Sequence, residues 1–138
     1  MFHNAPQNDS DIISAAREVL ANFKQHSSSL SYASVLTDDG FEVASEQGMA
    51  VANGGRFASI ASSLQALGEA AVRELHLGGA SSVLVFSDHG HIVQVRVEGS
   101  TLVLAAAEQR GETIGHALAL ARRAASDLGA QLPRITSL

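Results

Sequence analysis

The sequence contains no cysteine, no tryptophan and one tyrosine, and aromatic residues make up only 4% of its 138 residues. Without cysteine, the chain can form no disulfide and offers no thiolate to a metal or a substrate. With so few aromatic rings, it lacks the stacking platforms on which single-stranded nucleic acids are bound. The formal net charge is −5 and no stretch is strongly basic, so a phosphate backbone is an unfavourable partner. These absences exclude thiolate chemistry and predict that the protein does not bind nucleic acid.

Long apolar runs are also absent. No run approaches the roughly 18 apolar residues that a membrane-spanning helix needs. Residues 1–10 lack the basic start and apolar centre of a secretory signal. We therefore expect a cytoplasmic protein without membrane insertion. Apolar residues still make up 46% of the chain, which predicts one domain with a core of Ala, Val, Leu and Ile.

The second half of the chain predicts three consecutive strands. Residues 82–86 form a mostly apolar run, residues 91–97 alternate between apolar and polar side chains, and residues 101–107 form a third apolar run. Short glycine-bearing turns at residues 87–90 and 98–100 separate these runs. Strands joined by such tight turns must be antiparallel neighbours, because parallel pairing needs a long crossover.

A further antiparallel pair is predicted at residues 30–37 and 41–45, on either side of Asp38-Asp39-Gly40. Glycine readily takes the positive φ that such a turn demands. The sheet therefore has two hairpin-type units in sequence, and the remaining segments must cover it.

Three stretches carry apolar residues at helical spacing and predict helices at residues 11–26, 56–75 and 113–128. Asp9 or Ser10 can cap the first helix, because either side chain accepts from the unpaired amides of the first turn. The buried faces expected of the first and last helices are Ile12, Ala16, Val19, Leu20 and Phe23, and Ile114, Ala117, Leu118, Ala121, Ala124, Ala125 and Leu128.

The ends of the domain are predicted from composition. Gly129 and Pro133 predict that the last helix stops near residue 128. The polar residues 1–9 are expected to form a disordered leader, residues 10–129 a single domain, and residues 130–138 a C-terminal tail.

The central predicted helix carries two stripes. The larger one predicts the face that packs on the sheet: Phe57, Ile60, Ala61, Leu64, Leu67, Ala71 and Leu75. The second consists of small residues where a solvated helix normally carries long charged ones: Ser59, Ser63, Ala66 and Ala70. Because small residues let another helix backbone approach closely, this stripe predicts helix pairing.

The order of elements resembles the roadblock and dynein light-chain family, specifically its compact bacterial members. Three stretches carry the resemblance: VLTDDGFEVAS at residues 35–45, ASIASSLQALGEAAVRELHLGGASSVLV at residues 58–85, and residues 102–125 with Gly115 near the start of the last helix. The resemblance as a whole covers roughly residues 12–128. The sequence departs from the family at His116-Ala117, where an arginine often follows that glycine.

The resemblance implies an α/β (α+β) fold in the order helix, two strands, helix, three strands, helix. The expected sheet is five-stranded and antiparallel, with one helix on one face and two on the other. The resemblance further implies a non-enzymatic homodimer, formed through the central helix and an edge strand, that binds a small Ras-like GTPase. The alternatives are a GTPase-activating protein and a small-ligand sensor domain of related, profilin-like fold. The expected dimer and partner interface comprises Ser59, Ser62, Ser63, Ala66, Ala70 and Arg73.

The motifs that could carry chemistry have simpler structural explanations. Residues 88–91, Asp-His-Gly-His, place two imidazoles and one carboxylate together, but no further metal ligand is identifiable and the residues fit an exposed turn. Gly54-Gly55 could present free amides to a phosphate, but the Lys-Ser/Thr of a phosphate loop is missing. Arg56 or Arg110 could act in trans on a GTPase, and the sequence alone does not identify a partner for His116. We therefore expect no catalytic residue, no metal and no cofactor.

Overall fold

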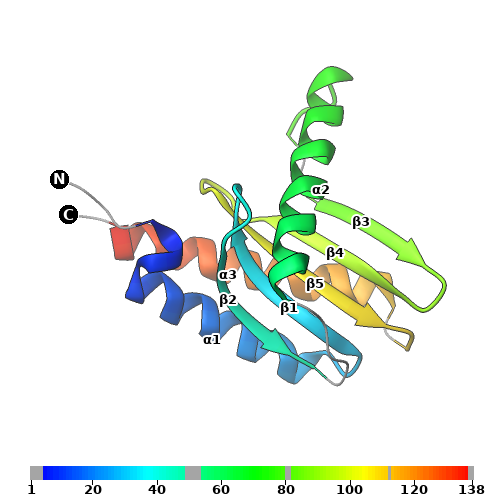
Figure 1. The fold of residues 1–138 in the computed structure, drawn as a ribbon, viewed down its shortest axis with the longest axis horizontal. Coiled ribbons are helices and arrows are strands. Elements are labelled where there is room, and N and C mark those ends of the chain that lie inside the picture. The colour runs from blue at the N-terminus through cyan, green and yellow to red at the C-terminus, as the bar shows by residue number, and fades with distance from the viewer. Residues whose placement is uncertain (1–4, 49–53, 80–81, 112, 137–138) are drawn as a thin grey trace.

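The structure is a computed structural model that describes residues 5–48, 54–79, 82–111 and 113–136 (Figure 1). Its element order matches the predicted one, with a short 3-10 helix added at the start. The elements are η1 (Pro6–Asn8), α1 (Ser10–His26), β1 (Leu30–Thr37), β2 (Glu42–Gln47), α2 (Gly54–Glu74), β3 (Ser82–Ser87), β4 (Gly90–Arg96), β5 (Leu102–Gln109) and α3 (Ile114–Thr136).

The strands form one five-stranded sheet in the order β2-β1-β5-β4-β3, and every neighbouring pair is antiparallel. The two chain segments of the sheet meet where β1 pairs with β5 from Thr37↔Leu102 to Leu30↔Glu108. The predicted turn at residues 38–40 forms between β1 and β2, with φ of +86° at Gly40. The amide of Gly40 donates to the carbonyl oxygen of Thr37 over 3.0 Å.

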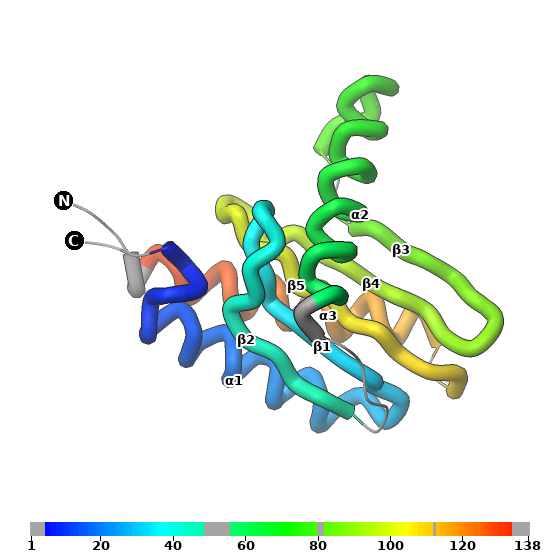
Figure 2. The backbone as a smooth tube through the Cα atoms, viewed as in Figure 1, coloured from blue at the N-terminus to red at the C-terminus, as the bar shows by residue number. Residues whose placement is uncertain are grey.

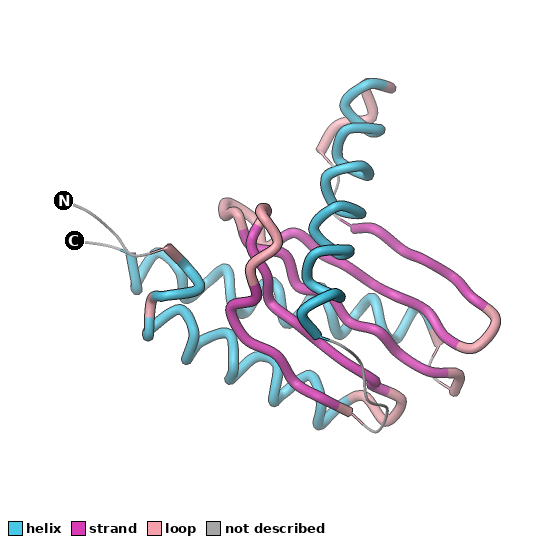
Figure 3. Tube along the Cα trace, in the orientation of Figure 1, coloured by secondary structure: helices cyan, strands magenta, loops and turns pink. Residues whose placement is uncertain are grey.

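Two helices cover one face of the sheet and one helix crosses the other (Figure 3). The main core lies between the sheet and α1 with α3, and it includes every residue predicted for the buried face of α1. Asp9 caps α1, as the sequence allowed, by accepting from the amides of Asp11 and Ile12 over 3.0 and 3.3 Å. This face therefore holds most of the buried apolar surface that stabilises the fold.

The α2 side of the sheet has a much smaller apolar cluster. It consists of Leu36, Ala58, Ala61, Val103 and Ala105, with Phe57 packed against it. The C-terminal part of α2 reaches past the strands (Figure 2). Only the first half of the helix therefore lies on this cluster.

The sheet-facing stripe predicted for α2 is wrong in part. Ile60, Leu67 and Leu75 are 52%, 69% and 66% exposed, and Ala71 is also exposed. Ala61 of the predicted stripe is buried, but the other buried residues, Ala58 and Gln65, lie outside that stripe. The helix is rotated from the predicted orientation because the sheet beneath offers the polar Gln94, which donates to the side-chain oxygen of Gln65 over 3.2 Å. Apolar periodicity cannot detect a buried face built on amide hydrogen bonds.

The predicted end of the last helix is wrong. α3 continues through Gly129 and Pro133 to Thr136. The helix continues because its apolar face continues. Leu128 is fully buried and Leu132 packs against the core. Burial of this kind offsets the helix-interior cost of glycine, about 1 kcal/mol.

The predicted disordered leader is ordered in part. Pro6–Asn8 form η1, which contacts α1, β1 and β2. Residues 1–4 lie outside the described residues, as do residues 137 and 138 of the predicted tail.

Candidate protein-binding surface

The outward side of α2 is apolar or small and carries little charge. Ile60 and Leu67 are 52% and 69% exposed. Around them lie the exposed small residues of the predicted pairing stripe. We call this surface the α2 face: Ser59, Ile60, Ser63, Ala66, Leu67 and Ala70. Contiguous exposed apolar surface of this kind marks a protein-binding site more often than a solvated face.

The free edge of the sheet at β3 is also uncharged. Its sequence is SVLVFS, and Leu84 and Phe86 are 39% and 67% exposed. Among the described strands, β3 pairs with β4 alone, so its outer backbone groups can pair with a further strand. The opposite edge, β2, carries Glu42 and Glu46 and lies against α1. Of the two edges, β3 is therefore the one suited to a protein partner.

α2 and β3 are in direct contact, which makes the two surfaces neighbours. A Cβ built on Gly68 of α2 would lie 2.8 Å from Cγ2 of Val83. Because successive strand residues point to opposite faces, Val83 faces α2 while Leu84 and Phe86 face the other side of the sheet. The candidate surface therefore includes the α2 face, the edge of β3 and the two exposed apolar side chains beneath it.

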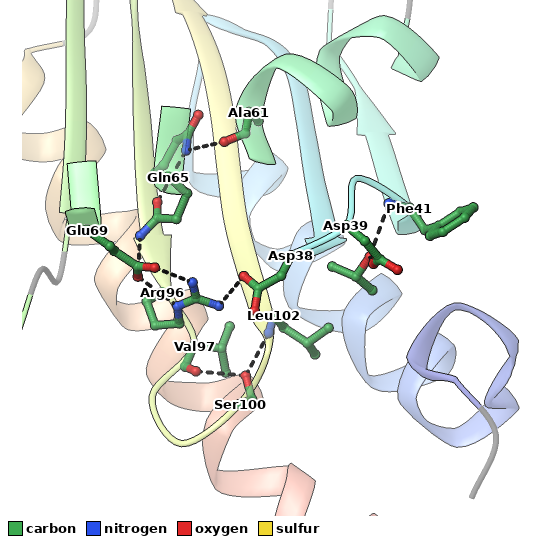
Figure 4. Close-up of polar contacts among 12 residues, drawn as sticks. Asp38, Asp39, Phe41, Ala61, Gln65, Glu69, Arg96, Val97, Ser100 and Leu102 are labelled. Atoms are coloured by element: carbon green, nitrogen blue, oxygen red, sulfur yellow. Dashed lines mark hydrogen bonds and ion pairs between the residues drawn. The ribbon is translucent and has the colours of Figure 1, made fainter. Parts of the chain in front are cut away.

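A charged cluster lies between α2 and the sheet. Arg96 of β4 donates from Nε and Nη2 to the two carboxylate oxygens of Glu69, over 2.9 and 2.6 Å. Its Nη1 lies 2.8 Å from Oδ1 of Asp38 in the β1–β2 turn. Figure 4 shows this single guanidinium between the helix and the turn. The two-pronged contact is the stronger geometry for an arginine and a carboxylate.

The pKa values of Glu69 and Arg96 are both shifted by this contact. The hydrogen bonds from Arg96 lower the pKa of Glu69 below its ordinary value, although partial burial opposes the shift. The same hydrogen bonds raise the pKa of Arg96. Both groups are therefore charged at neutral pH, and the cluster is an ion pair.

The charged cluster continues inward as a chain of amides. Gln65 donates from Nε2 to Glu69 over 3.1 Å. Gln94 donates from Nε2 to the side-chain oxygen of Gln65 and to the carbonyl oxygen of Ala61, over 3.2 and 3.0 Å. These contacts explain why a glutamine, and not a leucine, is fully buried beneath α2.

The predicted interface residues lie along α2 but differ in exposure. Ser62 is half-buried, because the β1–β2 turn covers it: a Cβ on Gly40 would lie 3.2 Å from its Oγ. The other predicted residues are exposed: Ser59, Ser63, Ala66, Ala70 and Arg73. Their role in dimerisation remains a prediction.

Sequence reasoning missed several residues of this surface and of its support. Leu84 and Phe86 could have been recognised from the lack of any charge in residues 82–87. The pair Gln65 and Glu69, four residues apart on one helix, had no recognisable partner until β4 brought Arg96 to them.

The other motifs form no shared site in the described ranges. Asp88, His89, Arg56, Arg110 and His116 are exposed. Within those ranges, no group of three or more His, Asp or Glu side chains is placed to hold a metal. Nε2 of His116 lies 3.3 Å from the carbonyl oxygen of His26. Gly54-Gly55 form the first residues of α2.

Grooves in the described part of the structure lie beside α1 and α3. One groove, of about 820 Å³, lies beside α3 and is lined by residues that include Val95, Arg122 and Gly129. It is open to solvent and belongs to the α3 side of the sheet. Among the helices that the structure describes, none is long and apolar enough to cross a membrane.

An antiparallel five-stranded sheet with one helix on one face and two on the other places the chain in the profilin-like class of α/β proteins. It is similar to profilin II from Acanthamoeba castellanii, with a TM-score of 0.59, 16% identity, and coverage of 83% of this chain and 97% of that one. Residues 15–105 match the Roadblock/LC7 domain, and the chain belongs to that family.

Two solved roadblock-type structures are more similar than profilin. MglB from Myxococcus xanthus has a TM-score of 0.81 and 11% identity, covering 100% of this chain and 97% of that one. A structure described as MglB with tetrameric arrangement has a TM-score of 0.79 and 17% identity, covering 98% and 96%. At these identities, the likeness establishes the fold. No match is found among curated proteins.

Proposed function

We propose that this protein is a non-enzymatic, cytoplasmic homodimer that binds and regulates a small Ras-like GTPase. The observation that carries this proposal is the uncharged surface formed by the α2 face and the β3 edge. A monomer would leave Leu67, Leu84 and Phe86 in water together with unpaired strand backbone. Association with a protein removes both costs.

A second copy of the chain suits this surface because the surface is self-complementary. Two-fold symmetry brings identical patches together. The β3 edge carries no charge that would repel its own copy, and the small residues of the α2 face allow two helices to approach closely. One solved structure of a similar chain is described as tetrameric, which supports self-association as a property of this fold.

The choice of a Ras-like GTPase as partner rests on membership of the roadblock family. Such a partner is regulated by the position of its switch loops, which a rigid platform can hold in one arrangement. The dimer offers a platform of this kind, with two α2 helices on one side of a continuous sheet.

Phosphate release tests this proposal. The pure protein is incubated with GTP and magnesium, alone and with a candidate Ras-like GTPase. We expect no release from the protein alone, and co-elution of the two proteins on gel filtration. Release by the protein alone, abolished by a point change in it, would contradict a non-enzymatic role. Absence of any complex with the GTPase in either nucleotide state would contradict the partner.

Two variants distinguish a protein that acts as a rigid platform from an activator that supplies an arginine to the GTPase. Arg56→Ala and Arg110→Ala each remove an exposed guanidinium outside the α2 face. If the protein is a platform, both variants keep its effect on GTP hydrolysis. Loss of about 10³-fold or more in the stimulated rate with either variant would instead identify an arginine finger.

A further inference from the structure

The second half of α2 rests on little apolar surface. None of residues 66–74, all of which the structure describes, is buried. The buried apolar residues Ala58 and Ala61 belong to the first half. By contrast, α1 buries residues along most of its length, from Ile12 to Phe23. Since burial of apolar area is the main stabilising contribution to helix docking, this contribution is small for the second half of α2.

Polar contacts hold this half of the helix instead. Glu69 receives both hydrogen bonds from Arg96, and the same arginine reaches Asp38 in the β1–β2 turn (Figure 4). The side chain of Arg96 therefore joins three elements, α2, β4 and the turn. A two-pronged guanidinium contact fixes both distance and direction, so it sets the position of the helix as well as its distance from the sheet.

The inner end of the polar chain does not lock α2 in the same way. Gln94 is fully buried, and within the described part of the chain no donor reaches its Oε1. A buried acceptor without a donor destabilises the arrangement that contains it. The contact between Arg96 and Glu69 is therefore the main polar restraint on the second half of α2.

We propose that Arg96 is a positioning residue for the α2 face, and that breaking its contact with Glu69 releases the second half of α2 while the rest of the fold stays intact. The consequence for partner binding rests on the proposed function, because it requires the α2 face to be the docking surface. Arg96 itself need not touch the partner, since it acts through the position of Ala66, Leu67 and Ala70.

Amide hydrogen exchange on the full chain tests this inference. Arg96→Met keeps most of the side-chain bulk but removes the guanidinium. Arg122→Met is the matched control, because Arg122 is an exposed arginine of α3 whose Nη2 lies 3.4 Å from Oγ of Ser82. We expect Arg96→Met to accelerate exchange in residues 65–74 by about tenfold or more, with β5 unchanged, as local opening requires. Arg122→Met should leave both regions unchanged.

Two exchange results for Arg96→Met would overturn the inference. One is unchanged exchange in residues 65–74 of Arg96→Met. The other is an equal increase in β5, which would show a loss of global stability and not a positioning role. Arg96→Lys should restore part of the protection, because a lysine can still meet Glu69 with one ion pair but cannot form the two-pronged contact.

Neutral replacements distinguish the roles of the two carboxylates that contact Arg96, those of Glu69 and Asp38. Glu69→Gln should reproduce the effect of Arg96→Met on α2, whereas Asp38→Asn should accelerate exchange mainly in the turn. If Asp38→Asn opens α2 and Glu69→Gln does not, the proposed contact is the wrong one.

Binding is measured last. Titration with the GTPase reports the affinity for that partner, and light scattering reports dimerisation. Arg96→Met should weaken association at the α2 face, and Arg96→Lys should recover part of it. If the wild type binds its partner and Arg96→Met binds equally well, the positioning role is overturned. The proposed function is unaffected by that result. A wild-type chain that neither dimerises nor binds a GTPase would contradict the proposed function, and the exchange result would still report on the restraint.

Discussion

Gly68 of α2 lies directly over Val83 of β3, so close that a Cβ at residue 68 would approach Cγ2 of Val83 to 2.8 Å. Only hydrogen occupies the side-chain position between the helix and the edge strand at this point. The contact joins the α2 face to the β3 edge, and it limits how closely the helix can approach β3.

This contact predicts a coupled effect of two substitutions. Gly68→Ala should destabilise the fold or leave it unchanged, although alanine in a helix is normally better than glycine by about 1 kcal/mol. In a Val83→Ala background the added methyl group has room, so Gly68→Ala should be stabilising by about 0.5–1 kcal/mol. A double-mutant cycle from urea unfolding measures the difference. Additive effects within about 0.3 kcal/mol would show that the two side chains do not meet.

The α2 face predicts the position of the dimer interface. Ala66→Glu should convert the dimer to a monomer, because a charged side chain would be desolvated between two close helices. Ala119→Glu is the matched control, since Ala119 is an exposed alanine of α3 on the other side of the sheet. Sedimentation velocity reports both masses. A dimeric Ala66→Glu protein with an unchanged dissociation constant would place the interface elsewhere.

The rotation of α2 predicts unequal costs for three leucine truncations. Leu20 is fully buried, so Leu20→Ala should cost about 2–5 kcal/mol of unfolding free energy. Leu64 is half-buried, so Leu64→Ala should cost less unfolding free energy than Leu20→Ala. Leu67 is 69% exposed, and in a monomeric background such as Ala66→Glu its truncation should change stability by less than about 0.5 kcal/mol. A cost at Leu67 as large as at Leu20 would mean that α2 has the predicted orientation and not the observed one.

These leucines also show what the sequence could predict and what it could not. The face of α1 was predictable because Ile12, Val19 and Phe23 follow one apolar stripe with a solvated opposite side. α2 has apolar residues on more than one side, and its buried face is decided by Gln65 meeting Gln94. That pairing depends on strand register, which local periodicity does not contain.

Local signals were also overruled by burial at the end of α3. Gly129 and Pro133 are ordinary helix-ending residues, yet the helix continues because Leu128 and Leu132 contact the core. The antiparallel pairing of β1 with β2, of β3 with β4 and of β4 with β5 was predictable, since tight turns fix those neighbours. The pairing of β1 with β5 joins strands far apart in the sequence, so no turn signal contains it. The Arg96 contact was not predictable from the sequence. Its three residues, Asp38, Glu69 and Arg96, come from separate elements of the fold.

Tyr32 predicts a loss of stability at alkaline pH. Burial, reinforced by the neighbouring Glu42 carboxylate and opposed by Ser45, raises the pKa of Tyr32 from 10.0 to about 12. Between these values the unfolded chain loses the phenol proton and the folded chain keeps it. Stability is therefore full below pH 10 and falls as the pH rises toward 12, by about 2 kcal/mol from this group.

Tyr32→Phe isolates this contribution, since phenylalanine cannot ionise. The difference in unfolding free energy between the wild type and Tyr32→Phe should shrink as the pH rises from 10 to 12. The hydroxyl also donates to Glu42 over 2.7 Å, so the variant is expected to start with a constant offset. A difference that stays constant across this pH range would mean that Tyr32 titrates equally in both states.

The mass of the purified wild-type chain, measured by light scattering at micromolar concentration, tests the central claim most directly. Within the described part of the chain, no segment covers the α2 face or the β3 edge, and the proposed dimer would cover both. We predict a mass of twice the 14.3 kDa of a single chain. A mass of 14.3 kDa would contradict the homodimer and, with it, the platform proposed to bind the GTPase.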